Sequence, residues 1–316
     1  MVLEASIKSI DLSIGYEYDY GVLWVVNSVN IVVWRNTTYC IIGESGCGKS
    51  TLGNAMAGLL PTYAYTNGYL EVEGRIVVRG DETNYNGVRG RIVTRIPQDP
   101  SSALNPYVTI GEQLVKVIKH HYGVRENPLE KAGKLLKLVK LPLEVIDYYP
   151  HELSGGMKQR AAIALALAPM PKVIVADEPT SSLDAYLRGV VASLLKRVQR
   201  ELNLTLVFIT HDIALASTIC DYITVMYAGT IVEEGASDKV LHNPLHPYTQ
   251  LLFKAIPKLG SRETLSTIPG SPPSPTSYPE GCRFRPRCPV GFSECYKAPK
   301  LIEVEPQHKV SCWRYA

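Results

Sequence analysis

The sequence predicts an α/β fold built around a parallel sheet, and three observations lead to this prediction. KVIVADE and LTLVFITH are short apolar runs rich in β-branched residues, which suit strands covered on both faces. Apolar residues at helical spacing between positions 187 and 198 separate these runs, so strand, helix and strand form a crossover. Earlier in the chain, the apolar run TYCII leads into a glycine-rich segment and then a helical pattern.

Other parts of the chain predict antiparallel strands. Residues 1–35 alternate apolar and polar positions around the turn-forming stretch GYEYDYG. GRIVTRIPQ is a further strand candidate. Residues 221–235 predict a hairpin whose turn lies near Ala228 and Gly229.

A helical region is predicted between residues 100 and 149. Apolar residues recur there at intervals of three and four, which places them on one face of each helix. These faces carry Ile110, Leu114, Val117 and Ile118, and then Leu129, Ala132, Leu135, Leu136 and Val139. We therefore expect a helical insertion between strand-rich parts.

The sequence changes in character after about residue 241. The segment 268–281 contains five prolines, so we expect an extended linker there rather than the interior of a helix or strand. Four cysteines follow it. We divide the chain into a main domain at 1–240, with a helical subdomain at about 100–155, and a C-terminal extension at 241–316 with a cysteine-rich tail.

Composition and charge narrow the function classes. Of the 316 residues, 46% are hydrophobic and 20% charged, and the net charge of +3 gives no case for a nucleic-acid partner. The apolar run at 161–176 is broken by Pro169, Pro171 and Lys172, which makes it a poor membrane span. With no signal peptide evident, we expect a soluble intracellular protein that reaches a membrane only through a partner.

Residues 43–50, GESGCGKS, match the phosphate-binding pattern G-x-x-x-x-G-K-S in full. The backbone of such a loop wraps phosphates, and the following helix N-terminus adds partial positive charge. Lys49 is expected to reach the β- and γ-phosphates, and Ser50 to bind Mg²⁺. A chance glycine-rich turn is the alternative, which the strand and helix on either side disfavour. The expected nucleotide contacts are Gly43, Ser45, Gly46, Cys47, Gly48, Lys49, Ser50 and Thr51.

The pair Asp177–Glu178 follows a predicted strand directly. Ligands of open α/β sheets bind at the carboxyl ends of strands, so Asp177 is expected to hold Mg²⁺. Glu178 suits a base that polarises the attacking water. An acidic helix cap is the alternative, and it is weak beside a phosphate-binding loop.

Further motifs make residues 5–235 resemble the ATP-binding-cassette (ABC) ATPases. LSGGMKQR at 153–160 resembles the signature motif of this family, Gln98 its Q-loop, SSLD at 181–184 its D-loop and His211 its switch histidine. The motifs also occur in the family's order. The resemblance implies a P-loop NTPase cassette that hydrolyses ATP, with an antiparallel β subdomain and an α-helical signature subdomain.

The resemblance further implies that two cassettes pair head to tail around two ATP molecules. Each ATP then contacts the P-loop of one chain and the signature of the other. Ser154, Gly155 and Gly156 precede a predicted helix, whose N-terminus suits a γ-phosphate. Asp184 of the D-loop is counted among the nucleotide contacts.

Roles for the remaining site residues also follow from the resemblance. Gln98 is expected to contact Mg²⁺ and the attacking water, and His211 to hydrogen-bond the γ-phosphate. The adenine is expected to stack on Tyr16, with Tyr18 and Tyr20 as alternatives. The competing interpretation is that these tyrosines merely cover the antiparallel sheet.

Three longer stretches extend the resemblance over nearly the whole chain. QDPSSALNPYVTIGEQL, LHPYTQLLFKAIP and the segment from IPGSPPSP to GCRFRPRCP resemble the dipeptide/oligopeptide-permease ATPases, and SGGMKQR favours the D-type over the F-type subunit. This implies an F-type ATPase as heterodimer partner, two integral membrane permease subunits and an extracellular substrate-binding protein. The protein is then expected at the cytoplasmic face of the cell membrane, with its helical region facing the permease subunits' coupling helices.

The cargo is less constrained, because such an ATPase does not contact it. Dipeptides and oligopeptides are expected, although relatives move oligosaccharides or nickel. A soluble ABC ATPase not coupled to transport is the alternative from another class. Such factors usually carry two fused cassettes or a long coiled-coil insertion, whereas this chain has one cassette and no heptad run.

The C-terminal cysteines form a candidate metal site with the spacing C-x5-C-x6-C-x16-C. Structural zinc usually shows a tighter first pair, whereas iron–sulfur clusters accept more varied spacing. The resembled permease ATPases carry a [4Fe–4S] cluster, and its ligands here would be Cys282, Cys288, Cys295 and Cys312. Zinc, with His308 as a substitute ligand, and an empty or disulfide-linked tail remain alternatives.

Other residues near or outside this site receive simpler interpretations. Arg283, Arg285 and Arg287 surround the cysteines and could offset the negative charge of a cluster. Structural disulfides are unexpected in a cytosolic protein, with hyperthermophiles as an exception. We therefore interpret Cys40, Cys47 and Cys220 as buried or incidental thiols.

Overall fold

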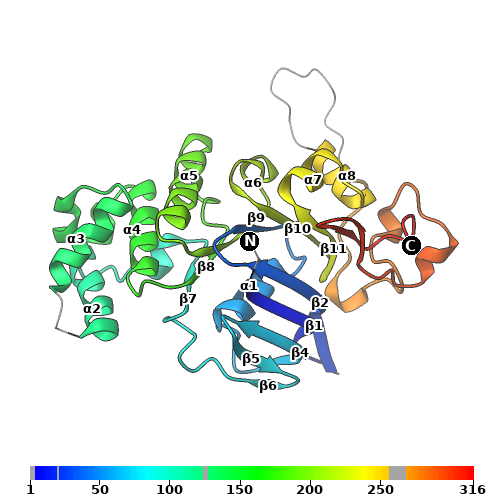
Figure 1. Ribbon diagram of the computed structural model, residues 1–316, viewed down its shortest axis with the longest axis horizontal. Helices are drawn as coiled ribbons and strands as arrows, with labels where there is room; N and C mark the ends of the chain where they lie inside the picture. Colours follow the sequence, from blue (N-terminus) through cyan, green and yellow to red (C-terminus); the bar gives the residue numbers. More distant parts are fainter. Residues whose placement is uncertain (1–3, 20, 124–126, 256–267) are drawn as a thin grey trace.

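The computed structural model describes residues 4–19, 21–123, 127–255 and 268–316, and these residues contain two sheets (Figure 1). The larger sheet has the order β12 (Ile302–Glu305), β13 (His308–Val310), β11 (Thr230–Ala236), β10 (Tyr222–Tyr227), β3 (Thr38–Ile42), β9 (Thr205–Thr210), β8 (Val173–Asp177) and β7 (Val93–Ile96). The smaller antiparallel sheet has the order β2 (Gly21–Trp34), β1 (Ala5–Tyr18), β4 (Ala64–Val72), β5 (Arg75–Arg79) and β6 (Glu82–Thr83). The helices are α1 (Lys49–Ala57), α2 (Ile110–Tyr122), α3 (Pro128–Leu138), α4 (Gly155–Leu167), α5 (Ala185–Glu201), α6 (Ile213–Ile219), α7 (Ser237–His242) and α8 (Pro247–Lys254).

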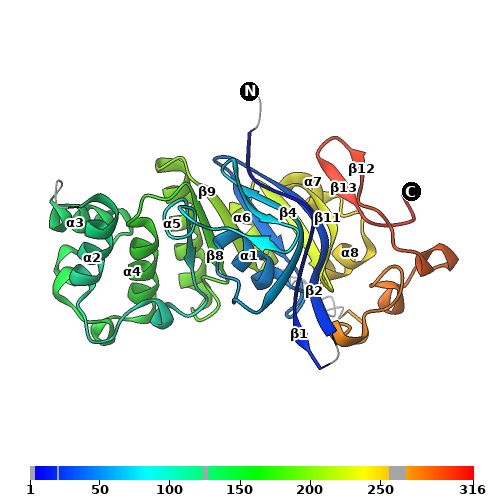
Figure 2. The same cartoon turned by 90° about the horizontal axis from the view of Figure 1, so that it is seen from below.

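The predicted α/β class and the predicted strands are confirmed. Strands β10, β3, β9, β8 and β7 run parallel to one another, so their carboxyl ends meet at one edge. The side chains of β3 alternate between two apolar layers: Cys40 and Ile42 face the layer that contains α4–α6, and Tyr39 and Ile41 face α1 and the antiparallel sheet. Helix α1 therefore lies between the two sheets, as Figures 1 and 2 show.

The helical region is confirmed, with one error in its predicted face. Ile110, Leu114 and Ile118 of α2 are buried, and a Thr109–Glu112 capping box closes its N-terminus. Leu129, which the apolar pattern assigned to the core, is 58% exposed. It lies in the first turn of α3, whose buried face begins only at Ala132. This region and the C-terminal extension lie at opposite ends of the molecule (Figure 1).

The C-terminal extension adds two strands to the main sheet, besides the predicted linker and cysteine-rich tail. Strand β13 pairs antiparallel with β11, where His308 lies opposite Gly235, and β12 pairs with β13. The proline-rich segment makes a short turn at Pro275–Ser277 that contacts β2. Within the described parts of the chain, none of the helices has both the length and the apolar character that a membrane crossing needs.

The interpretation of Cys40 and Cys220 as free thiols is wrong, because the two residues form a disulfide with a Cα–Cα distance of 5.8 Å. Cys220 ends α6 and leads into β10, which pairs directly with β3, so that Ile223 lies opposite Cys40. This adjacency of β3 and β10 arises only in the folded sheet. The spacing of the two cysteines in the sequence therefore gave no sign of it.

Candidate functional site

The predicted P-loop joins β3 to α1 through backbone conformations that favour glycine. Gly43, Gly46 and Gly48 have φ angles of 153°, 80° and 100°, which residues with side chains rarely adopt. A Cβ atom on Gly43 would lie 2.2 Å from the carbonyl oxygen of Met226, so this position also permits the close approach of β10. Gly48 directly precedes α1. The motif therefore adopts the turn that its sequence predicts.

Lys49 directs its charge into this loop. Its Nζ donates hydrogen bonds to the carbonyl oxygens of Gly43, at 2.8 Å, and Glu44, at 2.9 Å. Lys49 is only 4% exposed. A buried ammonium group held by loop carbonyls is placed to meet the phosphates that such a loop binds. Ser45 and Gly46 are exposed, whereas Cys47 is buried.

The two predicted Mg²⁺ ligands, Ser50 and Asp177, lie side by side. Ser50 Oγ donates to Asp177 Oδ1 at 2.9 Å, and Arg95 of β7 donates from Nη2 to Oδ2 at 2.6 Å. Asp177 is 4% exposed, so the arginine balances a nearly buried charge. Sequence reasoning missed Arg95. The pairing of β7 with β8 explains this contact: Arg95 lies opposite Val175, and Asp177 is two residues further along β8.

Glu178 and His211 meet at the carboxyl edge of the parallel sheet. Glu178 follows β8 with a φ of 45°, and its N–H donates to the carbonyl of Ile209 at 2.9 Å. His211 follows β9, and its Nδ1 lies 3.2 Å from Glu178 Oε2. The side chains are 15% and 52% exposed, so the pair opens to solvent. Gln98 follows β7 at the same edge and is exposed.

The predicted adenine contact, Tyr16, lies near the end of β1 with its ring 6.2 Å from that of Tyr63. A Cβ on Gly48 would lie 3.0 Å from the carbonyl oxygen of Val25 in β2, so this end of the antiparallel sheet borders the P-loop. Tyr18 is 52% exposed. Tyr20 lies outside the described residues.

The signature and D-loop residues lie at two adjacent helix N-termini. Ser154 caps α4, since its Oγ accepts the N–H of Met157, and Asp184 caps α5 by accepting the N–H of Leu187. A Cβ on Gly156 of α4 would lie 3.4 Å from the Leu187 side chain of α5, so the N-terminal ends of these two helices are in close contact. Ser154, Gly155 and Asp184 are exposed. These N-termini can thus offer N–H groups to an anion outside the chain.

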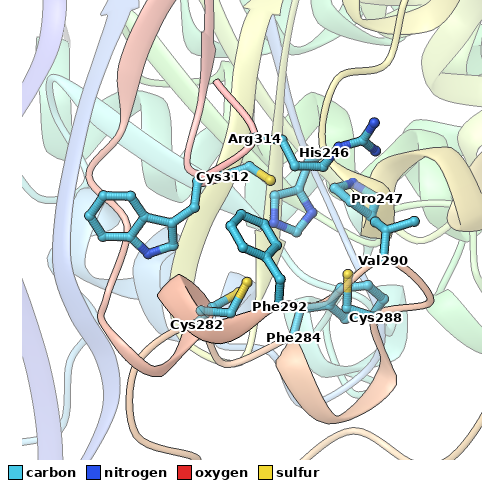
Figure 3. A pocket seen from close by; sticks show the side chains of 11 residues that line it. His246, Pro247, Cys282, Phe284, Cys288, Val290, Phe292, Cys312 and Arg314 are labelled. Atoms are coloured by element: carbon cyan, nitrogen blue, oxygen red, sulfur yellow. The ribbon is translucent and has the colours of Figure 1, made fainter. Parts of the chain in front are cut away.

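The four C-terminal cysteines line one pocket (Figure 3). Its other walls include Phe284, Phe292, Trp313 and His246. Burial raises the pKa of the Cys282 thiol to about 11 and also raises the pKa of Cys288 and Cys312. These thiols therefore keep their protons near neutral pH until a metal displaces them.

The residue types in this pocket favour a bound metal, but their arrangement in the structure does not form a metal site. Four thiols in one pocket suit an iron–sulfur cluster or zinc. Among the described residues, however, no three or more His, Cys, Asp or Glu side chains have the arrangement that holds a metal ion. The cavity measures about 10 Å³, room for about one water molecule. The lining side chains must therefore move apart to admit a cluster.

Two expectations about the residues around the cysteines are wrong. His308 is no substitute ligand, because it is fully buried with Nε2 2.8 Å from Glu233 Oε1. The histidine in the cysteine pocket is His246, whose Nδ1 accepts the N–H of Tyr248 at 3.0 Å and whose pKa burial lowers to about 3. The charge of Arg287 faces the P-loop, where it pairs with Glu44, instead of the cysteines.

Comparisons with known proteins agree with these motifs. Residues 26–181 match the family described as "ABC transporter", and residues 232–295 match "Oligopeptide/dipeptide transporter, C-terminal region". The chain is 39% identical to the "Oligopeptide transport ATP-binding protein OppD" of Haemophilus influenzae, over 96% of this chain and 95% of that protein. It is 38% identical to the "Oligopeptide transport ATP-binding protein OppF" of Escherichia coli, over 96% and 94%.

A solved structure supports the same fold. It is described as "Dimeric structure of a post-hydrolysis state of the ATP-binding cassette MJ0796 bound to ADP and Pi", and it covers 73% of this chain and 98% of its own. The TM-score is 0.64 at 26% sequence identity. The chain therefore belongs to the ATP-binding proteins of ABC transporters, in the branch with the oligopeptide/dipeptide transporter C-terminal region.

Proposed function

We propose that this chain is the ATP-hydrolysing subunit of an importer of dipeptides or oligopeptides. The observation that carries the catalytic part is the meeting of the P-loop, the Ser50–Asp177 pair and the Glu178–His211 pair at one edge of the parallel sheet. The match of residues 232–295 and the similarity to oligopeptide transport ATP-binding proteins support the cargo. Oligosaccharide or nickel cargo remains the alternative for the same ATPase.

Each residue of the site receives a role in this proposal. The P-loop backbone and Lys49 hold the phosphates, and Ser50, Asp177 and Gln98 hold Mg²⁺, which supplies Lewis acidity there. Glu178 accepts a proton from the attacking water, and His211 donates to the γ-phosphate. The contact between His211 and Glu178 supports a second role for His211, which is to orient the Glu178 carboxylate. Tyr16 stacks on the adenine.

A second cassette completes the site. Ser154, Gly155 and Asp184 are exposed at helix N-termini, which supports a γ-phosphate held across a head-to-tail dimer. We propose an F-type ATPase as this partner, with the present chain as the D-type subunit. The chain is 39% identical to an OppD protein and 38% identical to an OppF protein, so overall identity does not separate the D-type from the F-type. The D-type assignment therefore rests on the sequence motifs.

Two integral membrane permease subunits, fed by an extracellular binding protein, are the proposed transport partners, which places the chain at the cytoplasmic face of the membrane. A cavity of about 320 Å³ between α2 and α3, lined by Val115, Leu129 and Ile146 among others, supports the helical region as their docking site. The exposure of Leu129 fits such a contact.

We further propose that Cys282, Cys288, Cys295 and Cys312 hold a [4Fe–4S] cluster. The shared pocket supports this, and so does the donor set, which contains four thiols and no carboxylate. Zinc remains the alternative for the same four thiols, and His246 also lines the pocket. Anaerobic purification followed by iron, sulfide and zinc analysis tests the cluster proposal, and zinc without iron would refute it.

The ATPase proposal is tested with Glu178→Gln in the complex assembled with its membrane subunits. The variant should bind ATP with wild-type affinity but lose hydrolysis and ATP-driven uptake of labelled peptides into vesicles. Glu201→Gln, at the exposed end of α5, is the matched control. Unchanged turnover in Glu178→Gln would refute the base assignment. Uptake of another solute with intact hydrolysis would reassign only the cargo.

A further inference from the structure

The C-terminal extension contacts the P-loop through an arginine that precedes a cysteine of the pocket. Arg287 donates from Nη1 to Glu44 Oε2 at 2.8 Å and from Nη2 to Glu44 Oε1 at 3.1 Å. Its Nε donates to the carbonyl oxygen of Pro269 at 2.8 Å. Arg287 is 8% exposed. The Glu44 side chain is 23% exposed. A bidentate arginine–carboxylate pair fixes orientation as well as charge, so Arg287 holds the Glu44 carboxylate in a defined orientation.

Glu44 transmits this position to Lys49. It is the second residue of the P-loop, and its carbonyl oxygen accepts the Lys49 Nζ hydrogen bond at 2.9 Å. Its own N–H donates to Tyr248 Oη of α8 at 3.0 Å, and Tyr248 is fully buried. The extension thus holds the side chain and the amide of Glu44, while the carbonyl of Glu44 holds the phosphate-binding lysine.

A second arginine of the same segment reaches the other end of the loop. Arg283 Nη1 donates to the carbonyl oxygen of Ala228 in the β10–β11 turn. The next residue, Gly229, donates its N–H to the carbonyl oxygen of Cys47 at 2.9 Å. Between the two arginines, Phe284 is 1% exposed, with its ring 5.2 Å from Tyr227 and 5.4 Å from Tyr248. The connection is therefore packed and not merely a surface contact.

We propose that Arg287 is a positioning residue of the ATP site, which acts through Glu44 so that nucleotide affinity depends on the C-terminal extension. Glycines allow a P-loop many alternative conformations. If ATP binding must select one of them, the lost conformational entropy weakens the affinity. The Arg287–Glu44 pair removes part of this cost before ATP arrives. The proposal rests on the P-loop being the ATP site, as in the function proposed above.

The test measures Mg-ATP affinity by calorimetry on the full chain, well below its unfolding temperature. Arg287→Gln should weaken affinity about tenfold, and Arg287→Lys less, because lysine keeps the charge but not the bidentate geometry. Arg285→Gln is the matched control: it removes a charge from the same segment, but Arg285 packs 3.7 Å over the ring of Tyr296. In the assembled transporter, Arg287→Gln should raise KM for ATP and leave kcat nearly unchanged.

A double-mutant cycle separates this role from general destabilisation. Glu44→Gln should weaken affinity like Arg287→Gln, and the double variant should be no weaker than either single one. Wild-type affinity in Arg287→Gln, equal loss in Arg285→Gln, or additive losses would overturn the inference. If Arg287→Gln does not fold, wild-type affinity in Arg287→Lys and Glu44→Gln overturns it equally. A wild-type chain that binds no ATP would instead refute the proposed function.

Discussion

Nδ1 of His211 lies 3.2 Å from Oε2 of Glu178 across the ends of two neighbouring parallel strands. The Glu178 side chain is 15% exposed, and the His211 side chain is 52% exposed. The proposed base and the proposed γ-phosphate contact thus orient each other before a nucleotide is bound. Loss of the histidine should therefore affect the chemistry more than the binding.

His211→Ala should lower ATP hydrolysis in the assembled transporter by about 100-fold, the lower range for a hydrogen-bond donor aimed at charge that develops in the transition state. ATP affinity should change by less than about threefold, because the P-loop makes the main phosphate contacts. Phosphate release and equilibrium binding measure the two effects. His242→Ala, in the short helix α7, is the control. Hydrolysis within twofold of wild type in His211→Ala would contradict the assigned role.

Arg95 is predicted to balance the charge of Asp177 in the nucleotide-free chain, where Mg²⁺ would do so after Mg-ATP binds. Arg95→Gln should lower the free energy of unfolding of the nucleotide-free chain by about 1–3 kcal/mol, since a nearly buried carboxylate loses a charge-assisted hydrogen bond. Mg-ATP should restore most of this loss, because the metal replaces the missing charge. Denaturant unfolding with and without Mg-ATP measures both effects. Exposed Arg91→Gln should change neither, and an equal loss with Mg-ATP present would contradict the prediction.

The local parts of the site could be predicted from the sequence. The order strand, GESGCGKS, helix determines the P-loop turn, and the structure has it between β3 and α1. Asp177 and His211 could be placed at strand ends, because the apolar runs before them end where the polar residues begin. Such patterns depend only on neighbouring residues.

The remaining features depend on contacts between distant segments. Arg287 meets Glu44 across 243 positions of sequence, and Cys40 meets Cys220 across 180. The pairing of β13 with β11 was also missed, because its short strands are partly polar and give little periodic signal. No spacing rule links such pairs, which meet only when the whole chain is folded.

Glu233 is predicted to anchor the extension to the cassette. This fully buried carboxylate accepts the N–H groups of Leu245 and His246, at 2.8 and 2.9 Å, and lies 2.8 Å from Nε2 of His308. Glu233→Ala should cost about 3–5 kcal/mol of unfolding free energy, because buried donors lose a charged acceptor.

The loss in Glu233→Ala should be concentrated in the extension. Amide hydrogen exchange should accelerate first in α8 and in β12–β13, which Glu233 joins to β11. Glu305→Gln, whose side chain is 46% exposed, is the control. Unchanged exchange in the extension of Glu233→Ala would contradict the anchoring role.

The Cys40–Cys220 disulfide should stabilise the strand that leads into the P-loop. It closes a loop with a sequence separation of 180, so in the chain-entropy account its loss costs about 2–5 kcal/mol. The variant Cys40→Ser/Cys220→Ser should unfold at lower denaturant concentration than the oxidised wild type and should not respond to reductant. Reduced wild type should match the variant.

Alkylation of denatured, metal-free chain without reductant should modify only Cys47, Cys282, Cys288, Cys295 and Cys312. Modification of all seven cysteines would show that the disulfide does not form, and β3 would then depend on sheet hydrogen bonds and packing alone.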